Sequence, residues 1–139
     1  MAKTNLAPFA QNKRTGIAIA TTAKTIYNDT ANTVLVVTAG PEGAILRRIT
    51  AIARATVTAT QLQYYRSLDG GVTMTFFGTA IMPAATLSAT TIFPEVLKYE
   101  LASGFLDTPI ALAANERIYC AIGVALAAGI VFTGEWEDF

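Results

Sequence analysis

Histidine is absent from this chain of 139 residues, and cysteine occurs once, at Cys120. Histidine is the commonest general base in enzymes and a frequent zinc ligand, so its absence excludes most hydrolase and zinc chemistry. A single cysteine permits no disulfide within the chain. There is also no glycine-rich phosphate-binding motif. We therefore expect a protein that is not an enzyme and binds no cofactor or metal.

Charged residues are scarce as well, at 14% of the chain, whereas soluble domains typically have roughly 25%. Ten basic residues balance ten acidic ones, so the chain lacks the basic excess of a nucleic-acid-binding protein. The hydrophobic fraction is 53%, which is more than one small domain can bury. These proportions predict apolar contacts with other chains, and we expect a homo-oligomer that makes no direct contact with nucleic acid.

Long apolar runs are missing too. The most apolar stretch, 119–132, contains two glycines and falls short of the ~20 residues that a membrane-spanning helix needs. Near the N-terminus, Pro8 and Gln11 interrupt the only candidate for the apolar region of an export signal. We expect a protein that is made in the cytoplasm and has no membrane partner.

The chain does contain short β-branched or alternating segments separated by turn residues. Strands are expected from Gly16 onward and at 33–38, 45–54, 61–67, 72–82, 118–126 and 130–137. Asp69 and Gly70 form the expected turn of a hairpin, whereas the segment 93–104 fits a helix or a strand, and both remain open. This pattern is typical of an all-β domain, a β-sandwich of the jelly-roll type, spanning residues 16–139.

The clearest alternation lies in the last third of the chain. Apolar residues recur at every second position from Ile118 to Leu126, and Ile130, Phe132 and Trp136 share one face of the next segment, with Gly134 between them. We predict that 118–126 and 130–137 pair as an antiparallel hairpin around a turn at 127–129. The residues expected to pack in the core are Ile118, Ile122, Val124, Phe132 and Trp136.

Residues 1–15 show no hydrophobic period and are expected to form an extended arm that lies on a neighbouring molecule. Candidate interface residues are Pro8, Phe9 and Arg14 in this arm, together with Arg47 and Arg48 in the strand 45–54.

Other side chains have a functional and a structural interpretation. Arg47, Arg48, Arg54 and Arg66 fit surface or interface ion pairs better than a nucleic-acid site. Glu135 and Glu137 project from one side of a strand, where a cation site competes with a solvated or inter-subunit face. The structural reading is favoured, because two carboxylates rarely suffice for tight calcium binding. The aromatic pairs Tyr64–Tyr65 and Phe76–Phe77 are expected to pack in the core or at an interface.

Two segments carry a resemblance to a known family. From Pro109 to Phe139 the chain has an apolar strand, an Ala-Asn-Glu turn and an acidic, aromatic end, and 45–60 has the pattern of an earlier strand and loop. In these segments the chain resembles the small jelly-roll proteins encoded among the head genes of tailed bacteriophages. The resemblance implies a virion protein that decorates or cements the capsid, commonly as a trimer, and contacts the major capsid protein or other virion proteins. The alternative is a receptor- or carbohydrate-binding module of a tail tip or fibre.

Overall fold

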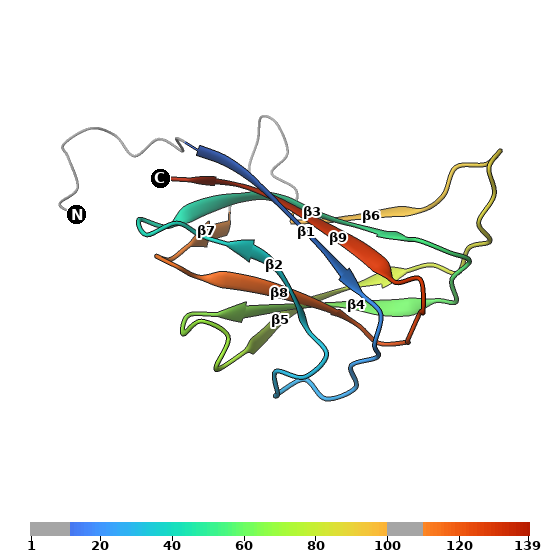
Figure 1. The fold of residues 1–139 in the computed structure, drawn as a ribbon, viewed down its shortest axis with the longest axis horizontal. Helices are drawn as coiled ribbons and strands as arrows, with labels where there is room; N and C mark the ends of the chain where they lie inside the picture. Colours follow the sequence, from blue (N-terminus) through green and yellow to red (C-terminus); the bar gives the residue numbers. More distant parts are fainter. Residues whose placement is uncertain (1–11, 100–109) are drawn as a thin grey trace.

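The computed structural model describes residues 12–99 and 110–139. Within these ranges, strands form two antiparallel sheets that pack face to face as a β-sandwich (Figure 1). The five-stranded sheet has the order β1-β9-β3-β6 with β7 also on β3, and the four-stranded sheet has the order β2-β8-β4-β5. The strands are β1 (Asn12–Ala20), β2 (Val34–Thr38), β3 (Ala44–Ala53), β4 (Thr60–Ser67), β5 (Thr75–Met82), β6 (Glu95–Lys98), β7 (Ile110–Leu112), β8 (Arg117–Ile122) and β9 (Ile130–Asp138).

Strands from the two halves of the chain pair with one another. β1 pairs with β9, β2 with β8, β3 with β6, and β4 with β5, so the chain follows one long hairpin wrapped into two sheets. This is the strand arrangement of a jelly roll. The prediction of an all-β sandwich is confirmed, and the segment 93–104, left open between helix and strand, contains the strand β6.

The predicted hairpin of 118–126 with 130–137 is wrong. β8 pairs with β2 and β4 in one sheet, whereas β9 pairs with β1 and β3 in the other. The connection 123–129 therefore crosses between the sheets, and the two strands face each other through the core. Alternation identifies which face of a strand is buried, but it does not identify the neighbouring strand.

Four of the five predicted core residues are nevertheless buried: Ile118, Ile122, Phe132 and Trp136. Val124 is 47% exposed, because β8 ends at Ile122 and Val124 lies in the crossing connection. Its backbone N–H donates a hydrogen bond to the Thr60 hydroxyl there.

Two other expectations change in detail. β1 begins at Asn12, so residues 12–15 pair with β9 and do not belong to an arm, while Pro8 and Phe9 lie outside the described residues.

In β3, Arg47 interrupts the expected alternation because the register with β9 shifts between Leu46 and Arg48, as at a β-bulge. Leu46 is consequently buried, whereas Ile45 is half-buried.

The β4–β5 hairpin has the predicted turn. Gly70 and Gly71 adopt φ values of 75° and 95°, which favour glycine. The Asp69 carboxylate accepts hydrogen bonds from the Thr73 N–H and the Ser67 hydroxyl, each 2.8 Å long. These bonds, led by the backbone bond from Thr73, lower the pKa of Asp69 to about 2.

The two sheets approach each other most closely at a pair of glycines. Gly16 in β1 and Gly134 in β9 are register partners, and β2 of the other sheet crosses against them. A Cβ atom on Gly16 would lie 1.9 Å from the Val36 carbonyl oxygen, and one on Gly134 would lie 2.7 Å from Cγ2 of Val37. Any side chain at these positions would force the sheets apart.

We expect Gly16→Ala to lower the free energy of unfolding by about 1–3 kcal/mol, because the obstacle is backbone that cannot rotate away. Denaturant unfolding measures this loss. Gly123→Ala is the matched control, since its Cβ would meet nothing closer than 3.4 Å. Equal losses in the two variants would contradict the close approach.

Three of the five tyrosines are embedded in the sandwich. Tyr64 is fully buried and packs edge-on against Tyr99 and Phe132. Burial, as the leading cause, raises the pKa of Tyr65 and of Tyr99 to about 12 and raises the pKa of Tyr64 further. The folded state therefore favours the neutral phenols.

This burial predicts a loss of stability at alkaline pH. Because these folded-state pKa values lie above the unfolded value near 10, the stabilisation is complete below pH ~10 and is lost as the pH rises through ~12. Denaturant unfolding between pH 9 and 12 measures the loss, and absorbance at 295 nm follows phenolate formation. Ionisation of Tyr64, Tyr65 and Tyr99 in the folded protein with a midpoint near pH ~10, the usual value of a free phenol, would show that these three phenols are not shielded.

Candidate functional site

Oppositely charged side chains meet across three strands of the five-stranded sheet. Arg48 in β3 donates to Glu135 in β9 at 2.7 Å. Arg47 donates to Glu137 at 2.5 Å, and Arg14 in β1 donates to Asp138 at 3.0 Å. We call these six residues the charged ladder. Each carboxylate at the acidic end of β9 thus has an arginine partner: Glu135 and Glu137 on the outer face of the sheet, and Asp138 on the buried face. Arg54 and Arg66 lie outside this group, where they donate to the Ala128 carbonyl and to Glu116.

A shallow depression of about 520 Å³ lies along the charged ladder. It is lined by Lys13, Arg14, Thr15, Arg47, Glu135, Trp136 and Glu137. Glu135 and Glu137 project from the same face, as predicted, but their partners are arginines. Arg14, Arg47 and Arg48, the described interface candidates, thus all lie at this end of the sheet and pair with carboxylates of the same chain.

The innermost carboxylate of the ladder joins three segments of the chain. Asp138 is 5% exposed, and its Oδ1 accepts hydrogen bonds from the Gly40 N–H at 2.9 Å and from Nε1 of Trp136 at 3.1 Å. Its Oδ2 accepts the bond from Arg14. Asp138 therefore connects β1, the β2–β3 turn and β9.

A second buried carboxylate has a similar role in the other sheet. Glu116 is 1% exposed and accepts hydrogen bonds from Nε of Arg66 and from the Ala113 N–H. Glu116 and Arg66 line another depression of about 570 Å³ beside the β4–β5 turn, together with Leu68 and Asp69. The bond from Ala113 shows that Glu116 stabilises the turn before β8. The guanidinium of Arg66 neutralises the charge of Glu116 within the protein.

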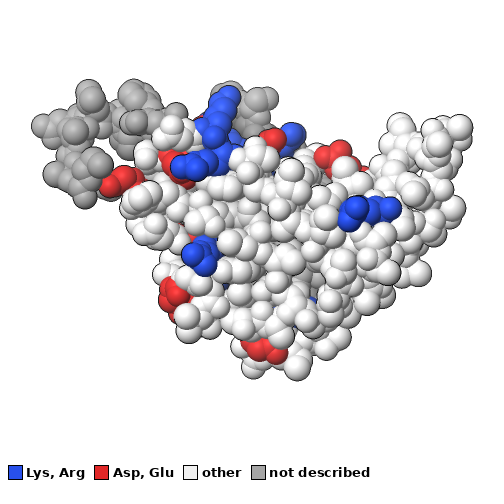
Figure 2. Space-filling model, in the orientation of Figure 1, with Lys and Arg blue, Asp and Glu red and all other residues white. Residues whose placement is uncertain are grey.

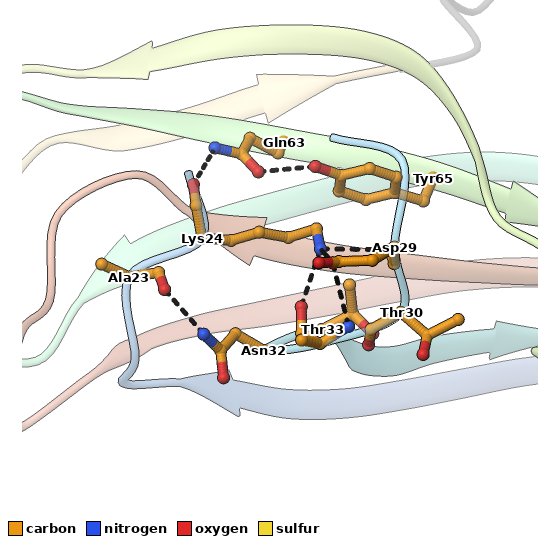
Figure 3. Close-up of polar contacts among 9 residues, drawn as sticks. Ala23, Lys24, Asp29, Thr30, Asn32, Thr33, Gln63 and Tyr65 are labelled. Carbon is orange, nitrogen blue, oxygen red and sulfur yellow. Dashed lines mark hydrogen bonds and ion pairs between the residues drawn. The ribbon is translucent and has the colours of Figure 1, made fainter. Parts of the chain in front are cut away.

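A buried lysine, which was not singled out from the sequence, fastens the β1–β2 connection to the four-stranded sheet (Figure 3). The Lys24 ammonium donates to the Asp29 carboxylate and to the carbonyl oxygens of Asp29 and Ala31. The bond from Lys24 is the main cause of a lowered pKa at Asp29. All three ammonium donors are thereby satisfied, as a buried lysine requires.

The same connection covers polar groups of β4. The Lys24 carbonyl accepts a hydrogen bond from Nε2 of Gln63, and the Tyr65 hydroxyl donates to Oε1 of Gln63 (Figure 3). Gln63 and Tyr65 are fully buried although they point away from the space between the sheets. Lys24 and the nearby Asn28, Asp29 and Thr30 have the composition of an ordinary polar loop. The sequence therefore does not indicate that Lys24 is buried and anchors the connection.

The aromatic pairs pack within the protein. Tyr64 and Tyr65 are buried, and Phe77 stacks against Tyr99 with ring centroids 5.1 Å apart. Phe76 stacks against Tyr27 at 4.8 Å, so one face of each ring is covered. The expectation of packing is confirmed for these residues.

The one thiol of the chain is shielded. Cys120 is fully buried, and burial raises the pKa of its thiol well above its usual value, which keeps the sulfur protonated. Among residues 12–99 and 110–139, no three acidic, histidine or cysteine side chains gather as a metal site. No helix in these ranges is long and apolar enough to span a membrane. Searches of family models, curated proteins and solved structures found no match to this chain.

We expect Asp138→Ala to lower the free energy of unfolding by about 2–4 kcal/mol, since it leaves the Gly40 and Trp136 donors without their acceptor. Glu135→Ala, which breaks the exposed pair with Arg48, should cost less than about 1 kcal/mol. Denaturant unfolding of both variants tests the difference. Equal losses would show that Asp138 has no special structural role.

Proposed function

We propose that this protein is a non-enzymatic structural component of a bacteriophage particle, a capsid decoration or cement protein. The observation that carries the proposal is its apolar exterior. Large hydrophobic side chains that are at least 40% exposed occur in both sheets and in the loops: Ile17, Ile19, Ile26, Tyr27, Leu35, Leu68, Val72, Ile81, Leu87, Ile92, Leu97 and Val124. On the face shown in Figure 2, charged side chains are few and most of the surface belongs to uncharged residues.

The distribution of these side chains supports contacts with several neighbours. They lie on β1, β2, β5 and β6 and on four connections, so no single concave site contains them. Dispersed apolar contacts suit a place in a shell of repeated subunits, whereas a small-molecule site is concave. The partners we propose are copies of this chain and the major capsid protein or other virion proteins.

The paired charges support protein partners over nucleic acid. Four arginines donate to carboxylates of this chain, and a phosphate backbone would have to compete with those bonds. They are Arg14, Arg47, Arg48 and Arg66. The proposed location is the virion, after synthesis in the host cytoplasm.

The tail-tip alternative requires aromatic side chains free to stack on a receptor or sugar. The exposed Tyr27 ring already stacks on Phe76, and Trp136 in the depression by the charged ladder is 7% exposed. These contacts favour decoration of the head.

Mass spectrometry and electron microscopy of purified particles of the phage that encodes this chain test the proposal. We expect the protein in many copies on the head surface. A few copies confined to the tail would establish the alternative instead. Particles that lack the protein would contradict both assignments.

A further inference from the structure

The edge strands of the sandwich differ in how well they are protected against pairing with another chain. Natural edge strands are usually short, bulged or charged, because an open edge offers unpaired backbone groups. β6 has four residues, begins at Glu95, ends at Lys98 and follows Pro94. β2 has five residues and a register shift after Leu35. β5 carries a shift opposite Tyr64 and Tyr65.

β1 has none of these protections along its second half. Its nine residues pair with β9 without a register shift, and the part from Thr15 to Ala20 contains no charge and no proline. Within the described ranges, no backbone hydrogen bond joins β1 to any strand except β9. β2 contacts β1 through the inner face at Gly16, so no strand among the described residues covers the outer edge of β1.

The outward side chains of this edge are apolar. Ile17 is 67% exposed and Ile19 is 40% exposed. Ile19 begins a row across the outer face that continues through Val131 and Ile52. The row beside it runs from Ile17 through Thr133 and Thr50 to Leu97, which is 46% exposed, whereas the first row ends at Glu95 in β6. Both rows are therefore uncharged from the open edge of β1 through β9 to β3.

We propose that two copies of this protein pair edge to edge through antiparallel β1 strands, forming one continuous sheet about a two-fold axis at Ile17. A two-fold axis perpendicular to the sheet keeps both outer faces on the same side, so outward residues meet outward residues. Ile17 then faces Ile17 of the second copy, and Ile19 faces Thr15. The uncharged outer face beside the edge of one copy then continues into that of the other.

This register follows from the charges near the start of β1. An axis at Gly16 would place Lys13 opposite Ile19, and an axis at Ala18 would pair only 16–20. The axis at Ile17 pairs 14–20, leaves Lys13 outside and places Arg14 opposite Ala20. It also sends the two charged ladders to opposite ends of the joined strands, so like charges do not face each other.

The inference deepens the self-association in the proposed function, although it does not depend on the virion assignment. A trimer is implied by the resemblance alone, whereas this edge is suited to a two-fold pair. Sedimentation of the purified full chain at micromolar concentration should therefore show a dimer.

Ile17→Lys replaces two facing isoleucines with two facing ammonium groups. We expect it to raise the dimer dissociation constant about a hundredfold, through lost apolar burial and like-charge repulsion. Ile81→Lys is the matched control, since Ile81 is 61% exposed on β5 at the edge of the other sheet. It should leave sedimentation unchanged, with circular dichroism confirming that both variants fold.

Disulfide trapping tests the register. Facing residues in antiparallel strands have Cα atoms roughly 4.5–5.5 Å apart, within the range of a disulfide, so Ile17→Cys should form covalent dimers under mild oxidation. Cys120 is buried and does not compete. A monomeric or trimeric parent, equal effects of Ile17→Lys and Ile81→Lys, or no trapping at Ile17 would each overturn the pairing. Dimers of a protein absent from particles would overturn only the virion assignment.

Discussion

The close passage of β2 against Gly16 and Gly134 is the constraint on which the sandwich depends. A jelly roll must bring the edge of one sheet under the edge of the other, because its strands alternate between the sheets. Here Gly16 in β1 and Gly134 in β9 are register partners that have no side chains, so the Val36 backbone of β2 can lie close to β1. The remaining core residues then fill a space whose depth this contact sets.

Buried charges hold the connections that this wrapping produces. Lys24 fixes the connection from β1 to β2, Asp138 fixes the β2–β3 turn, and Glu116 fixes the approach to β8. Each has hydrogen-bond partners on its charged group, which is the condition for burying an ion without a large penalty. A chain with few charges therefore places several of them where they order the backbone.

The sequence was informative wherever the physical signal is local. Alternation identified the inward faces of β8 and β9, and Asp69 with Gly70 identified the β4–β5 hairpin. The partner of each strand was not predictable, because the short apolar connection 123–129 suits a hairpin turn as well as a crossing between sheets. Likewise, the partners of Asp138 and Lys24 come from segments distant in the chain, and no spacing rule relates them.

The placement of the charges also explains the character of the surface. The arginines and acids of the charged ladder neutralise one another at one end of the five-stranded sheet. The other end of β1 has neither charge nor proline. An exposed edge strand of this kind promotes association, which a protein that must remain a monomer has to avoid. An uncharged edge with exposed isoleucines has the features of the contact surface that we propose.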